Sequence, residues 1–328
     1  MINKIKKINL NHSFIFFLFC NIVSIIIFKT NNFSASPIIC LILILIIGVS
    51  HGSLDHIKGK KLLKILDINK MSFFYLAYIL FVIFIIVAWV LIPTISLLFF
   101  LIFASYHFGK EDTQFLMEKN FITNQFLYFL KGSLVILAPM FFHFDETVTI
   151  YKFLLVEDES FYLTLDYIES NNILLIGIIL STLSSIFLFI KKFEIKKFAI
   201  FLDFFSIIIL NYYFSPLVAF TIYFCFLHSI RHSISLIHEI DNVNFNNGLR
   251  IFLKKALPLT ILTAILCLIS VFFLNNSYDL NSSIYKVIFI GLASLTFPHI
   301  LLEYLLEKYT RYISIVYNCT WKNSSENF

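Results

Sequence analysis

The chain has 328 residues, of which 59% are hydrophobic and 14% charged, and its formal net charge is +5. A soluble domain carries roughly 25% charged residues, so this composition excludes an ordinary soluble protein and indicates an integral membrane protein. The positive charge does not indicate a nucleic-acid partner, because the basic residues lie in short loops between apolar runs. The length suits a single transmembrane domain over residues 1–328, and there is no internal repeat or linker.

Ten apolar runs approach the length of about 20 residues that a membrane-spanning helix needs. In chain order they are Phe14–Phe28, Pro37–His51, Phe73–Ile92, Thr94–Phe108, Phe121–Phe142, Ile173–Ile190, Phe198–Phe214, Pro216–Ile240, Ala256–Leu274 and Ile284–Leu305. Pro93 and Pro216 break two longer runs into hairpins, because proline disrupts a helix interior. The runs lack the polar–apolar alternation of barrel strands, so we predict an all-α polytopic bundle of about ten transmembrane helices, with eight as the lower bound.

The first run allows two interpretations. Its basic start, its apolar core and the small residues Ser34 and Ser36 resemble a cleavable signal peptide. We favour a retained helix, because the run is long for a signal peptide and Asn31–Phe33 is a poor approach to a cleavage site. Either choice leaves the later spans in the same orientation.

The distribution of lysine and arginine predicts an orientation in the cell inner membrane, with both termini in the cytoplasm. With ten spans, the cytoplasmic loops receive most basic residues, including the groups Lys58–Lys64 and Lys191–Lys197. The outer loops receive only Lys29, Lys152 and, at the edge of a span, Lys286. This asymmetry follows the positive-inside rule.

Three segments fit this topology less simply. Lys131 falls inside the fifth run and weakens the prediction of that span. The segment Asp145–Asn172 is expected to be an acidic loop on the outer side. The C-terminal tail of about 306–328 is polar towards its end, and we expect it to be flexible from Asn318 onward.

The histidines carry the chemical signal of the sequence. The topology places seven of the nine in or near the cytoplasmic half of a span, namely His51, His56, His107, His228, His232, His238 and His299. Four even-numbered spans therefore present imidazoles at one depth, as a metal site between helices requires. His228 and His232 are four residues apart and share one helix face. The pair alone fits two hydrogen-bonded core histidines equally well, but a cluster of costly polar groups at one depth favours function.

Several charged residues lie near these histidines. Asp55, Glu111 and Glu303 each follow a histidine by four residues, so each is a candidate acceptor for a ring N–H. The alternative for Glu111 is that it begins a solvated loop. Arg231 either snorkels to the interface, which is the default, or pairs with an acid, or stabilises an oxygen species. Asp203 in the seventh run fits either a helix partner or a proton relay.

Other chemical signatures are absent from the sequence. The five cysteines, Cys20, Cys40, Cys225, Cys267 and Cys319, show no paired spacing, which argues against disulfides or a zinc knuckle. There is no P-loop, no Rossmann glycine pattern and no Gly-x-Ser-x-Gly, and the chain contains only 8 glycines. Nucleotide-dependent and serine-hydrolase chemistry are therefore not indicated.

Four histidine motifs together resemble one family. The segment Gly48-Val49-Ser50-His51-Gly52-Ser53-Leu54-Asp55-His56 resembles the Gly-x-x-His-Gly-x-x-Asp-His motif of the Brp/Blh family of bacterial and archaeal membrane proteins. The segment Tyr106–Gly109 resembles the second histidine motif of that family. His228–His232 resembles its His-x-x-x-His motif, and Pro298-His299 resembles its late Pro-His.

This resemblance implies a β-carotene 15,15′-dioxygenase, which cleaves the central double bond of β-carotene with O₂ to give two molecules of retinal. The retinal would typically serve a microbial rhodopsin. The motif positions imply that His51, His107, His228 and His232 bind Fe(II). We expect Asp55, His56, His299 and Arg231 to support these ligands, with His56 and His299 as reserve ligands.

The implied substrate fits the composition of the chain. β-Carotene is a rigid hydrocarbon about as long as the hydrocarbon core of a bilayer is thick, so it would enter from the lipid between helices. It has no polar handle, so the length and shape of a tunnel would select the bond that is cleaved.

Two other classes of function remain open at this stage. A di-iron desaturase or hydroxylase needs about eight histidines in several tight clusters, whereas this chain has a single pair. A transporter, or a partner in rhodopsin assembly without catalysis, would use the histidines as an ion or proton path.

Overall fold

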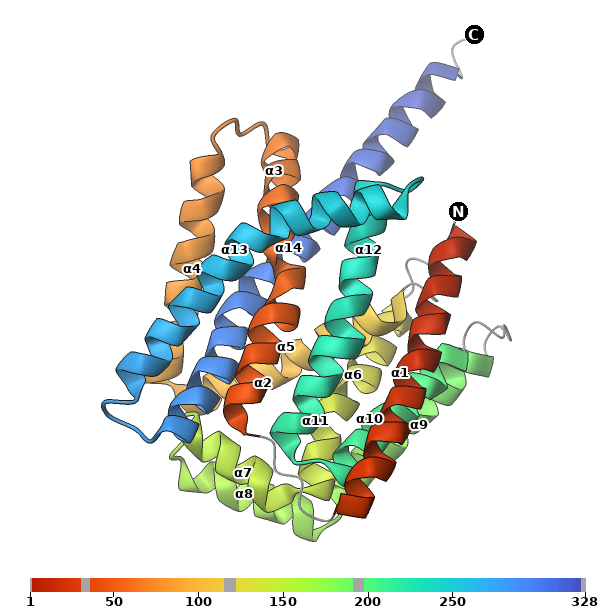
Figure 1. Cartoon of the computed structure of the whole chain (residues 1–328). Coiled ribbons are helices and arrows are strands. Elements are labelled where there is room, and N and C mark those ends of the chain that lie inside the picture. The colour runs from red at the N-terminus through yellow and green to blue at the C-terminus, as the bar shows by residue number, and fades with distance from the viewer. Residues whose placement is uncertain (1, 31–35, 115–121, 191–197, 326–328) are drawn as a thin grey trace.

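The chain folds into a bundle of helices, which the computed structural model describes over residues 2–30, 36–114, 122–190 and 198–325 (Figure 1). The elements are α1 (Ile2–Thr30), α2 (Pro37–Leu43), η1 (Ile44–Gly48), η2 (Val49–Leu54), α3 (Asp55–Ile65), α4 (Met71–Leu91), α5 (Pro93–Thr113), α6 (Ile122–Phe142), α7 (Phe144–Phe153), α8 (Glu159–Ser170), α9 (Ile173–Ile190), α10 (Ala199–Tyr213), α11 (Pro216–Ile222), η5 (Tyr223–Ser229), α12 (Ile230–Ile240), α13 (Phe245–Leu274) and α14 (Leu280–Ser325). These described ranges contain no strand, which confirms the all-α prediction.

Seven helical segments among the described residues are long and apolar enough to cross a membrane. They are Ile5–Phe28, Pro37–Ile65, Met71–Leu91, Asn124–Phe142, Pro216–Ile240, Phe245–Leu274 and Leu280–Thr310. Helices α8 and α9 meet at a bend of 67° and form an eighth candidate if they are taken as one broken span. The other two predicted runs are helical too, but α10 has only 15 residues and α5 ends in charged residues. Pro93 and Pro216 each begin a helix, as predicted.

The segment after α6 is more ordered than the sequence predicted. Instead of an open loop, the region Asp145–Asn172 contains most of α7 and all of α8. Asp158 caps α8, since its carboxylate accepts hydrogen bonds from the Ser160 and Phe161 backbone amides. The Ser160 hydroxyl also donates to this carboxylate, and these bonds lower the pKa of Asp158. Helix α14 continues to Ser325, and the expected flexibility of the tail from Asn318 onward stays a prediction.

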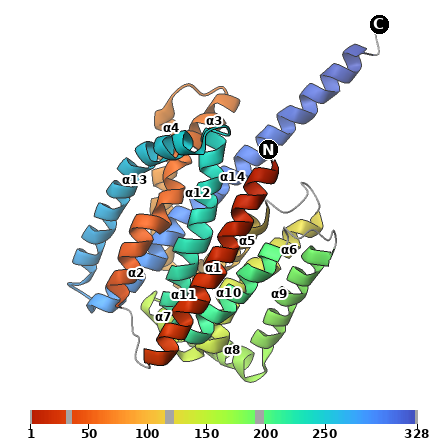
Figure 2. The same ribbon diagram turned by 45° about the vertical axis from the view of Figure 1, so that its right-hand side comes forward.

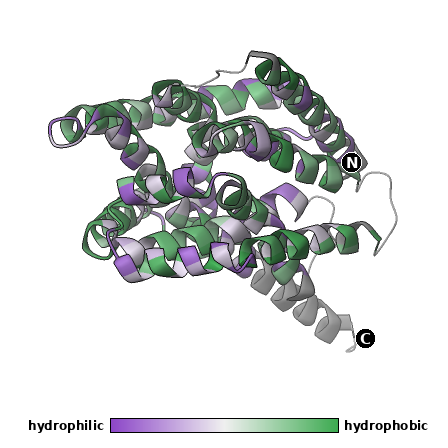
Figure 3. Cartoon of the chain, turned by 90° about the horizontal axis from the view of Figure 1, so that it is seen from below, coloured by the Kyte–Doolittle hydropathy of each residue, from purple (hydrophilic) through white to green (hydrophobic). Residues whose placement is uncertain are grey.

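The two ends of the bundle differ. The N-terminal end of α1 and the C-terminal end of α14 point towards the same end, and α7 and α8 cover the opposite end (Figures 1 and 2). Viewed from below, most of the ribbon is hydrophobic (Figure 3). Helices α4 and α13 are the most apolar spans and the least buried, with Leu91 and Phe272 exposed by 72% and 70%. An exposed apolar face of this kind is the surface that lipid covers.

The charge inside α6 is accommodated within the bundle. Lys131 is buried, its ammonium donates to the Ile200 backbone oxygen at 3.1 Å, and it lies 5.5 Å from the Phe204 ring centroid. Polar side chains in a membrane interior face protein in this way. Lys131 therefore does not prevent α6 from spanning the bilayer.

Helices α5 and α6 cross at two glycines. A Cβ atom on Gly109 would lie 1.8 Å from the Tyr128 carbonyl oxygen, and one on Gly132 would lie 1.8 Å from the Ser105 carbonyl oxygen. Only glycine allows the two backbones to approach this closely, which is the usual role of small residues between membrane helices. The crossing fixes α5, which carries His107, Glu111 and Asp112.

Two helices deviate from α geometry where the histidine motifs lie. Helix α2 continues through the π-helical turn η1 and the 3₁₀ turn η2, which contains His51. Helix α11 continues through the π-helical turn η5, which contains His228 and leads into α12. Such turns inside helices are frequent at functional sites, because they change which side chains share one face.

Candidate metal centre

Four buried histidines from three parts of the chain meet inside the bundle. They are His107 of α5, His228 of η5, His232 of α12 and His299 of α14, and none is exposed by more than 4%. The ring centroids of His107 and His228 are 5.3 Å apart, as are those of His107 and His299. Those of His232 and His299 are 5.6 Å apart. We call these four residues the histidine cluster.

Three of these rings each contact a carboxylate that belongs to another helix. Nδ1 of His228 lies 3.3 Å from Asp112 Oδ1, and Nδ1 of His232 lies 2.7 Å from Glu111 Oε2. Nδ1 of His299 lies 2.8 Å from Asp55 Oδ1. A ring that donates its Nδ1–H to a carboxylate carries its lone pair on Nε2, which is the atom a metal would bind.

The sequence predicted carboxylate partners, and one of them pairs with a histidine other than the expected one. Glu111 contacts His232 rather than His107, four residues before it. Asp55 contacts His299, while its predicted partner His51 has a side chain outside the residues that the structure describes. Glu111 and Asp112 are exposed by only 8% and 5%, so the alternative that they begin a solvated loop is wrong. The partners are neighbours across helices, which spacing along one helix does not reveal.

Glu303 lies between two members of the histidine cluster. Its Oε1 atom is 3.5 Å from Nε2 of His299, as the spacing of four residues predicted, and 3.8 Å from Nε2 of His232. It also forms an ion pair with Lys58 of α3, with 2.5 Å between the charged atoms. Glu303 thus contacts the histidine cluster and also links α14 to α3 through its ion pair with Lys58.

The donor atoms are close enough together to hold a metal ion. Possible ligand atoms of His107, His299 and Glu303 all lie within 4.8 Å of one another, and so do those of Glu111, His232 and Glu303. Buried imidazole nitrogens and carboxylate oxygens suit iron, zinc and similar transition metals. The residues of this site therefore fit a metal ion.

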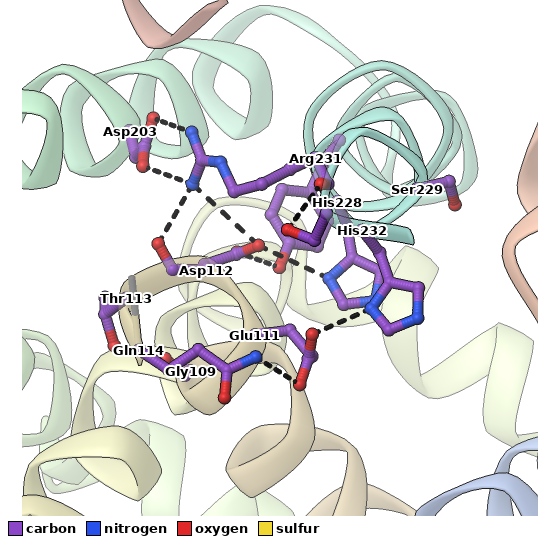
Figure 4. A network of polar contacts seen from close by, with 12 residues as sticks. Gly109, Glu111, Asp112, Thr113, Gln114, Asp203, His228, Ser229, Arg231 and His232 are labelled. Atoms are coloured by element: carbon purple, nitrogen blue, oxygen red, sulfur yellow. Dashed lines mark hydrogen bonds and ion pairs between the residues drawn. The ribbon is translucent and has the colours of Figure 1, made fainter. Parts of the chain in front are cut away.

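Arg231 does not snorkel to the membrane interface. It is exposed by 1%, and its guanidinium donates to both carboxylate oxygens of Asp203, at 2.7 and 3.1 Å. It also donates to Ser13 of α1 and to the Asp112 backbone oxygen, so it lies between Asp203 and Asp112 (Figure 4). The expectation of snorkelling is therefore corrected: Arg231 pairs with an acid, and Asp203 is its helix partner.

Asp112 links this ion pair to the histidine cluster. Its carboxylate accepts a hydrogen bond from the Tyr223 hydroxyl at 2.6 Å and contacts the His228 ring, while its backbone oxygen accepts from Arg231. The sequence did not single out Tyr223. Its place five residues before His228 on the same helical run was the signal that could have indicated it.

The remaining histidine predictions have separate outcomes. His51 lies in η2, but its side chain is outside the residues that the structure describes. His56 is half-buried, and its Nδ1 lies 3.0 Å from the Ser53 backbone oxygen, so its role as a reserve ligand stays a prediction. His299 was ranked as a reserve ligand, yet it is as close to His107 as His228 is.

Comparison with known proteins identifies the family of this chain. The family model described as β-carotene 15,15′-dioxygenase matches residues 42–307. A curated relative named β-carotene 15,15′-dioxygenase, from uncultured marine bacterium 66A03, is 26% identical over 299 residues, covering 84% of this chain and 96% of the relative. No solved structure matches the chain. The match over most of the chain shows that this protein belongs to the β-carotene 15,15′-dioxygenase family.

Proposed function

We propose that this protein is an iron-dependent dioxygenase that cleaves the central 15,15′ double bond of β-carotene with O₂. In the reaction the carbon–carbon double bond breaks, and each product, a molecule of all-trans-retinal, receives one oxygen atom. The observation that carries the proposal is the buried histidine cluster, with carboxylates on three of its rings, in a helical membrane bundle of this family.

The proposed ligands of Fe(II) are His51, His107, His228 and His232, as the resemblance of the motifs implies. The geometry adds His299 and Glu303 as further candidates, because their donor atoms lie close to those of His107 and His232. Bound Fe(II) supplies the electron transfer that lets O₂ react with a carbon–carbon double bond.

The protein residues hold and shield this site. Asp55, Glu111 and Asp112 accept from the Nδ1–H groups and thereby keep each Nε2 directed at one place. Phe108 and Phe224 cover the His228 ring, with centroids 4.9 and 5.8 Å away, and exclude water from that side. A dry site suits a hydrocarbon substrate and protects the reaction from hydrolytic side paths.

We also propose that the protein lies in the cell inner membrane with both termini in the cytoplasm. This orientation places the basic residues of α3, such as Lys60 and Lys61, inside and the acidic helices α7 and α8 outside. Retinal released from the site would be available to a microbial rhodopsin in the same membrane.

Expression in a bacterium that makes β-carotene tests the function. We expect the orange colour to fade and retinal to accumulate, and we expect His107→Ala to abolish both effects at equal protein levels. Metal analysis of the purified protein should find one iron per chain, whereas two would favour a desaturase-like enzyme. Unchanged pigment in cells that contain folded, iron-loaded protein would refute the proposal.

A further inference from the structure

An apolar cavity lies beside the histidine cluster and extends along α5. It encloses about 70 Å³ between α5, α6, α7, α11 and α14. Its walls include Leu97, Ala104 and Phe108 of α5, Pro139 of α6, Tyr151 of α7 and Phe220 of α11. No charged side chain lines it. Apolar cavities inside proteins stay free of water and can take up apolar molecules.

The cavity begins at the histidine cluster. Phe108 forms part of its wall, and the same ring packs edge-on against His228, with centroids 4.9 Å apart. Phe220 in the wall stacks on Phe224 at 5.4 Å and 10°, and Phe224 stacks on His228 at 5.8 Å and 16°. A row of nearly parallel rings therefore connects the cavity with the cluster, and a flat conjugated chain could lie against it.

The wall that α5 contributes to the cavity is about as long as half of a long polyene. Its α5 wall runs from Leu97 to Phe108, which corresponds to about 16 Å of helix at about 1.5 Å per residue. A C40 carotenoid is about as long as the hydrocarbon core is thick, about 30 Å, so one half measures about 15 Å. Tyr151 of α7 and Leu154, which follows α7, also line the cavity, and α7 lies at the end of the bundle opposite the termini (Figure 1).

The one hydroxyl-bearing side chain besides Tyr151 in the wall is already bonded within the protein. The Thr147 hydroxyl lies 2.8 Å from the His143 backbone oxygen and 3.1 Å from that of Pro139. This hydroxyl therefore donates its hydrogen bond to the backbone near Pro139 of α6 and not to a ligand. The cavity wall is apolar, which suits a hydrocarbon chain and not a polar molecule.

We propose that this cavity is where one half of the polyene substrate binds and that the part of its wall from α7 sets the distance from the ring terminus to the bond that is cleaved. The inference rests on the proposed function, because it assigns a place to the substrate of the same site. It adds the wall residues, above all Leu97 and Ala104, as determinants of which bond reaches the histidine cluster.

Filling the cavity at two depths tests this inference. The measurement is kcat/KM of the iron-loaded, purified protein for β-carotene and for an apocarotenal that has one complete half and one shortened half. Leu97→Phe shortens the cavity at its far end, so we expect at least a tenfold loss for β-carotene and a much smaller loss for the shortened substrate. Ala104→Phe obstructs the cavity near the cluster, so both substrates should lose activity while bound iron stays at the wild-type level.

The neighbouring residues offer matched controls. Leu98→Phe adds the same bulk one residue further along α5, where the side chain is 44% exposed, and Ala77→Phe adds it on the exposed face of α4. Both should leave the ratio of the two kcat/KM values unchanged. If Ala104→Phe loses its iron, the comparison of Leu97→Phe with Leu98→Phe decides alone, and a third variant, Leu101→Phe, repeats the test at a half-buried position of the wall.

The outcomes separate the two proposals. Equal loss for both substrates in Leu97→Phe, or no loss in either variant with normal iron content, would overturn the cavity assignment. A wild-type protein that cleaves neither substrate although it is folded and iron-loaded would instead refute the proposed function.

Discussion

Asp55 at the start of α3 accepts a hydrogen bond from His299 in α14, at 2.8 Å, although 244 residues separate them in the sequence. The same carboxylate accepts from the Tyr78 hydroxyl of α4 at 2.9 Å. Three helices thus converge on one buried acid at the edge of the histidine cluster. The acid fixes the orientation of the His299 ring, so its removal should affect the metal site before it affects the fold.

Asp55→Ala should therefore weaken metal binding. Loss of such a supporting carboxylate costs about 10- to 100-fold in metal affinity. The measurement is the iron content and the apparent iron Kd of the purified protein, together with retinal formation. Asp166→Ala is the control, because it removes an exposed carboxylate of α8 that is not part of the metal centre, and this variant should keep its iron. Equal iron affinity in Asp55→Ala and wild type would contradict the role of Asp55.

The buried ion pair between Arg231 and Asp203 leads to a stability prediction. Arg231→Met leaves Asp203 charged and buried, which should lower the free energy of unfolding by about 3–5 kcal/mol. The double variant Arg231→Met with Asp203→Leu should recover part of this loss, because neither charge is then left alone. Thermal unfolding of all four proteins in detergent completes the double-mutant cycle. Additive losses would show that the pair is not coupled.

Much of the bundle could be predicted from the sequence, because lipid imposes a simple rule on helix length and polarity. Pro93, Pro216 and the apolar runs marked the helices well. The prediction of a loop over Asp145–Asn172 was wrong, because α7 and α8 are short, amphipathic helices whose sequences are too polar to be read as membrane spans. The sequence predicted that the histidines lie at a shared depth in the membrane, because that prediction needs only the order and orientation of the spans.

Contacts between helices could not be predicted in the same way. The assignment of Asp55 to His299 depends on which helices are neighbours, and the periodicity of a single helix carries no such information. Arg231 was expected to snorkel because its acid partner, Asp203, lies on another helix. His299 was ranked as a supporting or reserve ligand, although its ring centroid lies 5.3 Å from that of His107, which no single motif shows.

The crossing of α5 and α6 predicts a sharp difference between two glycines. Gly132→Ala places a methyl group 1.8 Å from the Ser105 carbonyl oxygen, so the helices must separate and the midpoint of thermal unfolding should fall by several degrees. Gly291→Ala meets no atom within 4 Å and should leave the midpoint unchanged or raise it slightly. Similar midpoints for both variants would show that the close approach does not limit stability.

Removal of the metal should destabilise the protein reversibly. A ligand that binds only the folded state adds about 2.7 kcal/mol of stability at a concentration 100 times its Kd. Treatment with a chelator should therefore lower the unfolding midpoint, and added Fe(II) should restore it. The His107→Ala variant is the control, because its midpoint should not respond to the chelator. A wild-type midpoint that is insensitive to chelation would argue against a metal that bridges these helices.

The proposed orientation can be tested by labelling single cysteines from outside the cell. Glu157 before α8 and Lys61 in α3 are both exposed, so a cysteine at either position is accessible to a reagent on its own side. Glu157→Cys should react with a thiol reagent that does not cross membranes, and Lys61→Cys should react only after the cells are opened. The unsubstituted chain is the control for its native cysteines, of which Cys20, Cys40 and Cys225 are buried. The reverse pattern would place the basic end of the bundle outside the cell. It would contradict the predicted orientation, which rests on the excess of lysine and arginine in cytoplasmic loops.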